Sequence, residues 1–304
     1  MIFLRAEWRK LAITNYAIEK ELLGKYLPSG TELDLWNGNC FVSLIGFMFI
    51  NTKLLGIKIP FHTSFEEVNL RFYVKRFDNG EWKRGVVFIK EIVPKPALTF
   101  VANTIYKENY ETLPMEHFWC TEDNLRTIHY KWKKNNKWNS IKIEASAQKL
   151  NIESNSETEF ITEHYWGYAK VNNHKTNEYK VTHPKWKAYK VNNYDIDVDF
   201  GATYGQEFEF LNSTNPNSVM LAEGSEITVE NKKTIKNDTT TPYIKNCYFR
   251  LNLKVVASFV TSDFPSENPR TQNRNFPYTN TLPTIAEITQ TELIWELKCG
   301  FLNR

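Results

Sequence analysis

The chain has 304 residues and a mass of 35.8 kDa, with 41% hydrophobic, 14% aromatic and 24% charged residues. This composition indicates a soluble globular protein and excludes disordered, collagen-like and coiled-coil chains. The net charge of +3 is too small to indicate a nucleic-acid surface. No apolar run reaches the roughly 18 residues of a membrane span, and residues 1–10 lack the features of a signal peptide. We therefore expect a cytoplasmic protein with neither nucleic acid nor membrane as a partner.

Sequence motifs give little sign of a cofactor. The four cysteines are scattered without a C-x-x-C spacing, which argues against a disulfide framework or a cysteine zinc site. The chain contains no phosphate-binding, dinucleotide-binding, zinc-protease or serine-hydrolase signature. We expect neither a metal nor a cofactor.

The amino-acid composition of the sequence changes near residue 232. Up to that point, short runs of aromatic and β-branched residues alternate with turn signals, whereas the remainder is rich in Thr, Asn and Pro. We predict a domain over residues 1–232 and a poorly ordered extension of unknown role over residues 233–304.

The domain is predicted to be mainly β with few helices. One helix is expected between Thr14 or Asn15 and Pro28, because Ile18, Leu22 and Tyr26 form an apolar stripe. The remaining pattern is typical of a large antiparallel barrel or sandwich. Its strands are predicted over residues 40–50, 65–74, 84–93, 98–105, 127–132, 140–147, 159–171, 178–181, 188–191 and 207–211.

The strand over residues 65–74 carries the main candidate site. Alternation with period two places Glu67, Asn69, Arg71 and Tyr73 on one face and apolar residues on the other. The polar face would lie either in solvent or against a cavity, where Glu67 and Arg71 could hold each other and a polar ligand.

The strand over residues 84–93 is apolar on both faces and contains Lys90. The alternation places Lys90 on the face of Phe88, with Glu91 on the opposite face. Lys90 would either act as an amine nucleophile with a lowered pKa or extend its ammonium to solvent from a sheet edge.

Several long phrases carry a family resemblance. They are residues 27–34 (LPSGTELD), 41–47 (FVSLIGF), 59–74 (IPFHTSFEEVNLRFYV), 84–94 (RGVVFIKEIVP), 163–168 (EHYWGY), 179–186 (YKVTHPKW) and 221–225 (LAEGS). Together they resemble the uncharacterised YqjF-like family, a domain of unknown function grouped with the acetoacetate-decarboxylase-like superfamily. The resemblance covers about residues 3–229. It implies a curved antiparallel sheet closed into a cone-like barrel, with the polar face of residues 65–74 turned into a central cavity.

The resemblance does not extend to the catalytic lysines of the decarboxylases. Those enzymes use a lysine that forms a Schiff base with the substrate, and a second, adjacent lysine that lowers the pKa of the first; the pair follows a proline. Met115 and Glu116 stand at the matching place after Pro114, and no pair of lysines lies nearby. The sequence therefore favours a binding protein for a small, partly apolar, keto-acid-like molecule.

In this binding hypothesis, Arg71 anchors a carboxylate or keto oxygen and Glu67 orients Arg71. The other expected ligand-binding residues are Asn69, Tyr73, Tyr106, Tyr110, Met115 and Trp166. One alternative is an enzyme (a lyase, decarboxylase or isomerase) with Glu67 as general acid/base and Lys90 as a possible amine. Another is an interaction protein that works through its extension. The sequence leaves homo-oligomerisation open.

Overall fold

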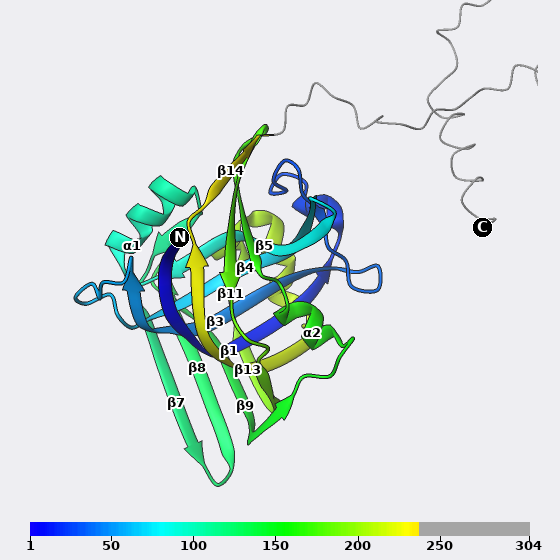
Figure 1. Cartoon of the computed structure of the whole chain (residues 1–304). Coiled ribbons are helices and arrows are strands. Elements are labelled where there is room, and N and C mark those ends of the chain that lie inside the picture. The colour runs from blue at the N-terminus through cyan, green and yellow to red at the C-terminus, as the bar shows by residue number, and fades with distance from the viewer. Residues whose placement is uncertain (237–304) are drawn as a thin grey trace, which may run out of the picture. The chain divides into compact units, whose positions relative to one another are not determined.

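Strands make up most of residues 1–236, the part of the chain that the computed structural model describes (Figure 1). The mainly-β class is therefore confirmed. The strands are β1 (Ile2–Ile18), β2 (Glu32–Leu33), β3 (Cys40–Leu54), β4 (Phe65–Asp78), β5 (Glu81–Val93), β6 (Tyr110–Thr112), β7 (Met115–Glu122), β8 (Leu125–Lys134), β9 (Lys137–Asn151), β10 (Trp166–Asn172), β11 (Lys175–Thr182), β12 (Lys187–Asp197), β13 (Ser218–Glu230) and β14 (Lys233–Lys236). The helical segments are η1 (Lys20–Leu23), α1 (Pro96–Val101), η2 (Ala102–Tyr106), α2 (Glu157–Thr162), α3 (Phe200–Tyr204) and η3 (Gln206–Ser213).

All the strands belong to one sheet, which curls until it meets itself. Its order is β14-β11-β10-β5-β4-β3-β1-β13-β12-β9-β8-β7, and β11 also pairs with β13. That extra pairing closes a ring through β1, β3, β4, β5, β10, β11 and β13, while β7, β8, β9 and β12 continue beyond it (Figure 1). The ring closes through short contacts, because β5 with β10 and β11 with β13 each pair over only two residues.

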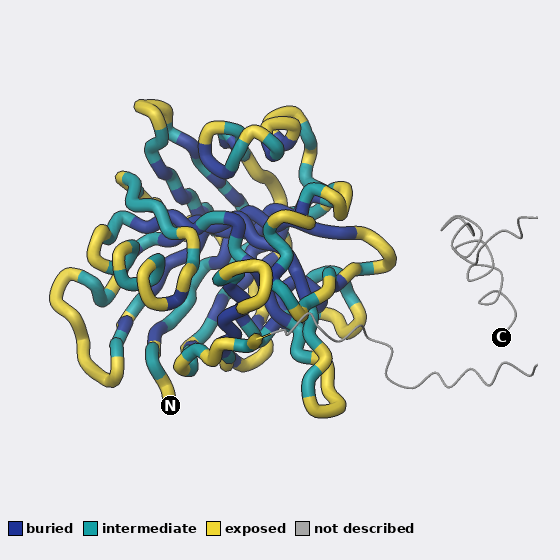
Figure 2. The backbone as a smooth tube through the Cα atoms, turned by 90° about the horizontal axis from the view of Figure 1, so that it is seen from above, coloured by how far each residue is buried: buried dark blue, intermediate teal, exposed yellow. Residues whose placement is uncertain are grey.

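The two faces of the ring's strands pack into separate core clusters. In β4, Leu70 and Phe72 belong to the first core cluster, which also holds residues of β8, β9 and β13. Tyr73 belongs to the second core cluster, with residues of β1, β3 and α2. Because successive side chains of a strand point to opposite faces, one strand supplies both clusters. The deeply buried backbone lies in the interior and the exposed backbone lies in the connecting turns (Figure 2).

Strand β5 contains one extra residue relative to β4. Leu70 pairs with Lys90 and Arg71 pairs with Phe88, so Ile89 has no partner of its own on β4. Such a two-against-one pairing is a β-bulge, and it shifts the alternation of side chains by one residue.

The bulge corrects the expected placement of Lys90. Phe88 lines the cavity described below, and after the bulge it is Glu91, not Lys90, that lines it. Lys90 instead forms an ion pair of 3.0 Å with Glu111 of β6. The prediction that Lys90 shares a face with Phe88 is therefore wrong.

Four predicted elements have a different secondary structure. The segment predicted as a helix after Asn15 begins as the end of β1, which pairs with β3 as far as Ile18, and continues into the short η1 and a turn. Residues 98–105, predicted as a strand, lie in α1 and η2, where Pro96 occupies a favourable position at the helix start. The strand predicted over residues 159–171 begins as α2, capped by Ser156, and residues 207–211 lie in η3.

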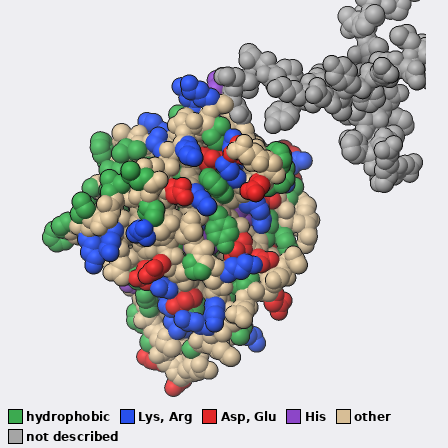
Figure 3. Space-filling view, in the orientation of Figure 1, with side chains coloured by type: hydrophobic (Ala, Val, Ile, Leu, Met, Phe, Trp, Pro, Cys, Tyr) green, Lys and Arg blue, Asp and Glu red, His purple; other side chains and the backbone are tan. Residues whose placement is uncertain are grey.

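The sheet continues four residues beyond the predicted domain boundary, since β14 pairs with β11. Residues 237–304, the rest of the predicted extension, lie outside the described residues. The prediction that they are poorly ordered concerns those residues and stays a prediction. Within residues 1–236, no helix is both long and apolar enough to cross a membrane. On the face seen in Figure 3, basic and acidic side chains are interspersed and form no large region of one sign.

Candidate functional site

A cavity of about 280 Å³ lies between the strands of the ring and helix α1. Most of its wall is apolar or aromatic, with residues from β1, β3, β4, β5, η2 and the segment before β12. Prominent among them are Trp8, Phe49, Phe65, Phe88, Tyr106 and Trp186. Walls of this kind with a few polar groups are typical of small-molecule sites.

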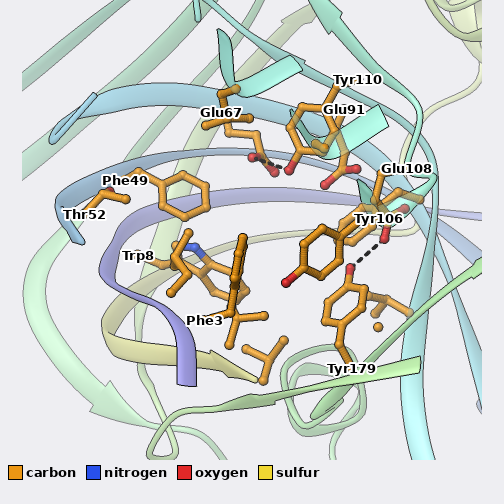
Figure 4. Close-up of a pocket in the computed structure, with 18 of the residues that line it drawn as sticks. Phe3, Trp8, Phe49, Thr52, Glu67, Glu91, Tyr106, Glu108, Tyr110 and Tyr179 are labelled. Atoms are coloured by element: carbon orange, nitrogen blue, oxygen red, sulfur yellow. Dashed lines mark hydrogen bonds between the residues drawn. The ribbon is translucent and has the colours of Figure 1, made fainter. Parts of the chain in front are cut away.

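Three carboxyl groups gather on one side of this cavity (Figure 4). Glu67 comes from β4, Glu91 from β5, and Glu108 from the segment between η2 and β6. Glu67 and Glu91 are each only 2% exposed. We call Glu67, Glu91 and Glu108 the carboxyl cluster.

Tyrosine hydroxyls hold two members of the carboxyl cluster in place. Tyr110 donates a hydrogen bond of 3.2 Å to Glu67 Oε2, and Tyr179 donates one of 2.8 Å to Glu108 Oε1 (Figure 4). The amide of Asn69 donates to Glu67 Oε1 at 3.0 Å. Glu91 Oε2 is buried and has no hydrogen-bond partner among the described residues.

Burial raises the pKa of every carboxyl in the cluster, because a low-dielectric interior disfavours the charged form. The pKa of Glu67 rises to about 7, although hydrogen bonds from Asn69 and Tyr110 and the charge of Arg71 oppose the rise. Burial and the nearby Glu67 raise the pKa of Glu108 to about 7. The pKa of Glu91 also rises, through burial and the charges of Glu108 and Glu67. The cluster can therefore hold protons at neutral pH.

Arg71 is the one arginine or lysine among the described residues that line the cavity. Its Nη2 donates to the carbonyl of Ile161 at 3.4 Å, and its guanidinium lies 5.6 Å from the centre of the Tyr73 ring. Its Nε is buried and has no hydrogen-bond partner in the described part of the chain. That N–H remains available for an oxygen of a ligand.

A buried histidine also lines the cavity. His164 Nε2 lies 3.2 Å from Asp34 Oδ2, which accepts a second hydrogen bond of 2.6 Å from Arg84 Nε. Burial lowers the pKa of His164 to about 4, so the imidazole is neutral at pH 7. Since the Asp34 carboxylate accepts from Nε2, Nδ1 is left as a hydrogen-bond acceptor.

The structure brings together most, but not all, of the predicted ligand-binding residues. Five of them line the cavity: Glu67, Arg71, Tyr106, Tyr110 and Trp166. Asn69 and Tyr73 do not line the cavity but contact two residues that do, Glu67 and Arg71 respectively. Met115 is misplaced in the prediction, because β7 lies outside the ring and its Met115 packs against the first core cluster.

The lysines lie away from the cavity. None of the described residues that line it is a lysine. Lys107 is exposed, and Lys133 and Lys134 precede the β8–β9 turn, where Lys134 pairs with Glu111. The second catalytic candidate, Lys90, is also held by Glu111. The described structure therefore places no lysine amine at the wall of the cavity.

Sequence reasoning missed four residues of the site and its surroundings. Alternation predicts the opposite face for Glu91, because nothing in the sequence signals the bulge. Glu108 lies in a segment between predicted elements and had no pattern to mark it. His164 and Asp34 lie in two of the phrases that carry the family resemblance, and that shared origin was the only signal linking them.

Comparison with known proteins identifies the relatives of the chain. The family DUF2071, described as an uncharacterized conserved protein, matches residues 5–226. The uncharacterized protein YqjF of Bacillus subtilis (strain 168) is 27% identical over 134 residues, which are 44% of this chain and 52% of that protein. The match therefore spans about half the length of this curated relative.

The fold is similar to several solved structures. An acetoacetate decarboxylase from Legionella pneumophila superposes with a TM-score of 0.54 at 13% identity, over 78% of this chain and 88% of that one. The enduracididine biosynthesis enzyme MppR, complexed with the condensation product of pyruvate and imidazole 4-carboxaldehyde, gives 0.55 at 7% identity, over 78% and 90%. An acetoacetate decarboxylase-like enzyme from Sphingomonas wittichii RW1 gives 0.53 at 7% identity, over 78% and 94%. These likenesses confirm the expected acetoacetate-decarboxylase-like fold.

Proposed function

The chain belongs to the DUF2071 family of uncharacterized conserved proteins, and from this premise we propose that it binds a small, partly apolar, keto-acid-like molecule in its cavity. The observation that carries the proposal is the cavity itself, with aromatic walls and a few buried polar groups that lack partners within the described chain. Burying such groups without partners is costly. A ligand that hydrogen-bonds to them would offset that cost.

Arg71 is the proposed anchor for the carboxylate or keto oxygen of the ligand. Its Nε has no partner among the described residues, and its Nη2 makes only a long hydrogen bond to Ile161. A guanidinium is well suited to bind carboxylates through paired N–H groups. Support for the ligand class also comes from MppR, a neighbour in fold that was solved with a product derived from pyruvate.

Binding without a Schiff base follows from the placement of the lysines. A Schiff base requires an amine in contact with the carbonyl of the ligand, and no lysine among the described residues lines the cavity. The proposed complex is therefore non-covalent.

Native mass spectrometry of the protein as purified from cells tests this proposal, followed by borohydride treatment with a panel of short keto acids. We expect a non-covalent ligand or added keto acid to be bound, and no covalent gain in mass. The Arg71→Met variant should bind keto acids at least about tenfold more weakly, and Arg76→Met, in an ion pair outside the cavity, is the matched control. A trapped lysine adduct, or no binding of any keto acid, would contradict the proposal.

A second candidate function is proton transfer on a bound keto compound, as in a lyase, decarboxylase or isomerase. The observation that favours it is the pKa of about 7 for Glu67 and Glu108, which suits a general acid/base at neutral pH. Exchange of α-hydrogens of a keto acid with deuterium, followed by NMR, tests this function. Exchange that is faster with the protein and lost in Glu67→Gln would support it, and exchange at the uncatalysed rate would exclude it.

A further inference from the structure

When it is ionised, the carboxyl cluster carries negative charge that no close cation of the described chain balances. Within residues 1–236, neither Glu67, Glu91 nor Glu108 takes part in an ion pair of 4.0 Å or less. Arg71 lowers the pKa of Glu67 but is not among the groups that shift Glu91 or Glu108. The groups nearest the cluster are tyrosines, which supply hydrogen bonds but no positive charge.

Glu91 points to what would complete this cluster. Its carboxyl is 2% exposed, lines the cavity, and leaves Oε2 without a hydrogen-bond partner in the described residues. In Figure 4 it lies beside Tyr110, the tyrosine that donates to Glu67. A buried, unpaired carboxylate oxygen is costly unless it is protonated or meets a donor that carries positive charge. Once Glu91 is ionised, this oxygen is therefore available to a positively charged donor that a ligand supplies.

The surroundings favour an organic cation over a metal ion. Among the described residues, no group of His, Cys, Asp and Glu is arranged to hold a metal. Aromatic rings border the cluster instead, including Tyr106 and Tyr179, whose ring centres are 5.7 Å apart and nearly perpendicular. Aromatic faces attract ammonium groups and accept the apolar body of an organic molecule.

We propose that the ligand of this cavity carries an ammonium nitrogen, which docks among Glu67, Glu91 and Glu108. This inference rests on the proposed binding function and narrows its ligand class to amines that also carry an oxygen for Arg71. The ammonium donates to the open oxygen of Glu91 and shares its charge with Glu67 and Glu108. Arg71, on the same face of β4 as Glu67, receives the carbonyl or carboxylate oxygen.

Proton release is the signature of this mode of binding. Burial holds protons on the carboxyl cluster near neutral pH, and an incoming cation favours the charged carboxylates. Tyr106, Tyr110 and Tyr179 face the same space, but burial raises the pKa of each well above 10, so they keep their protons. An amine should therefore release protons from the protein when it binds at pH 7, whereas a neutral ligand should not.

The experiment is isothermal titration calorimetry of the full chain at pH 7 in two buffers with different ionisation enthalpies. The probes are 2-phenylethylamine, its neutral analogue 2-phenylethanol, and the keto acid phenylpyruvate. We expect the amine to bind at least about tenfold more tightly than the alcohol, with protons released to the buffer. In Glu91→Gln, amine binding should weaken at least about tenfold while alcohol binding stays the same.

Glu116→Gln is the matched control, because Glu116 pairs with Lys131 on exposed β7, outside the cavity. It should leave all three affinities unchanged. If phenylpyruvate or the alcohol binds and the amine binds no more tightly than the alcohol, the ammonium inference is overturned and the binding function stands. If none of the three probes binds, both are overturned. Proton release by the unmodified chain tests the inference independently of how well any variant folds.

Discussion

The two faces of strand β4 are buried to the same degree but differ in what burial does for them. Phe72 is 0% exposed on one face, and Glu67 is 2% exposed on the other. Phe72 packs into an apolar cluster, where burial stabilises the fold. Glu67 is held by two hydrogen bonds and no close ion pair among the described residues, so burial there costs free energy. Depth alone therefore does not separate core from site, whereas the balance of polar partners does.

The largest expected effect tests the apolar face. Phe72→Ala should lower the free energy of unfolding by about 3–5 kcal/mol, because it removes a fully buried ring and leaves a cavity. Phe77→Ala, on the same strand but 53% exposed, is the control and should cost much less. Chemical denaturation measures both. Equal losses of unfolding free energy in the two variants would show that burial of Phe72 does not stabilise the fold more than the exposed Phe77 does.

The second prediction concerns the cavity face and pH. The pKa of Glu67 is about 7 in the folded chain, against an ordinary value of 4.5. The folded state therefore holds a proton between these values that the unfolded state has lost, and its contribution to stability disappears as pH rises from about 5 to above 7. Measured against Glu67→Gln, the stability of the natural chain should fall by about 2–3 kcal/mol between pH 5 and pH 8. A difference that is independent of pH would show that Glu67 titrates normally.

A smaller effect is expected at the hydrogen bond that Tyr110 donates to Glu67. Tyr110→Phe should cost about 1 kcal/mol and raise the pKa of Glu67 further, since the lost bond stabilises the charged carboxylate. Carbon-detected NMR titration of the glutamate carboxyls measures the shift. Tyr194→Phe, at a residue 44% exposed, should leave the Glu67 titration unchanged. A lower pKa in Tyr110→Phe would mean that the hydroxyl favours the neutral acid.

The smallest effect is expected on the outer side of the bulge. Lys90→Met breaks a partly exposed ion pair with Glu111, which should cost less than about 1 kcal/mol. Affinity for keto acids or amines should not change, because Lys90 does not line the cavity. Loss of ligand binding in Lys90→Met, but not in Lys131→Met, would contradict this placement and show that Lys90 takes part in ligand binding.

The sequence predicted the faces of β4 but not those of β5. Residues 65–72 keep an uninterrupted register with β3, so strict alternation gave the correct face for Glu67 and Arg71. In β5 the extra residue is Ile89, an ordinary apolar strand residue and not a glycine, proline or polar residue that would signal a bulge. The exchange of Lys90 for Glu91 at the cavity could therefore be known only from the pairing of the two strands.

Local patterns also failed where tertiary pairing decides the structure. The apolar spacing around Ile18 suits a helix, yet β1 continues to that residue because β3 pairs with it as far as Ile18 and β13 as far as Asn15. Glu108 joins the site only because η2 returns the chain to the ring, and Asp34 meets His164 across 130 positions of sequence. Contacts of that range leave no periodic trace in a single sequence.

The bulge at Ile89 decides which charged side chain β5 presents to the cavity. Deleting that one residue would restore simple alternation in β5 and still leave Phe88 and Glu91 on the cavity face and Lys90 on the other. Straightening the strand with Ile89 retained would instead turn Lys90 toward the cavity and Glu91 away from it, because every side chain beyond the bulge would shift by one step. In this sheet the loss of a bulge can thus invert the chemistry of a pocket without any change of sequence at the lining positions.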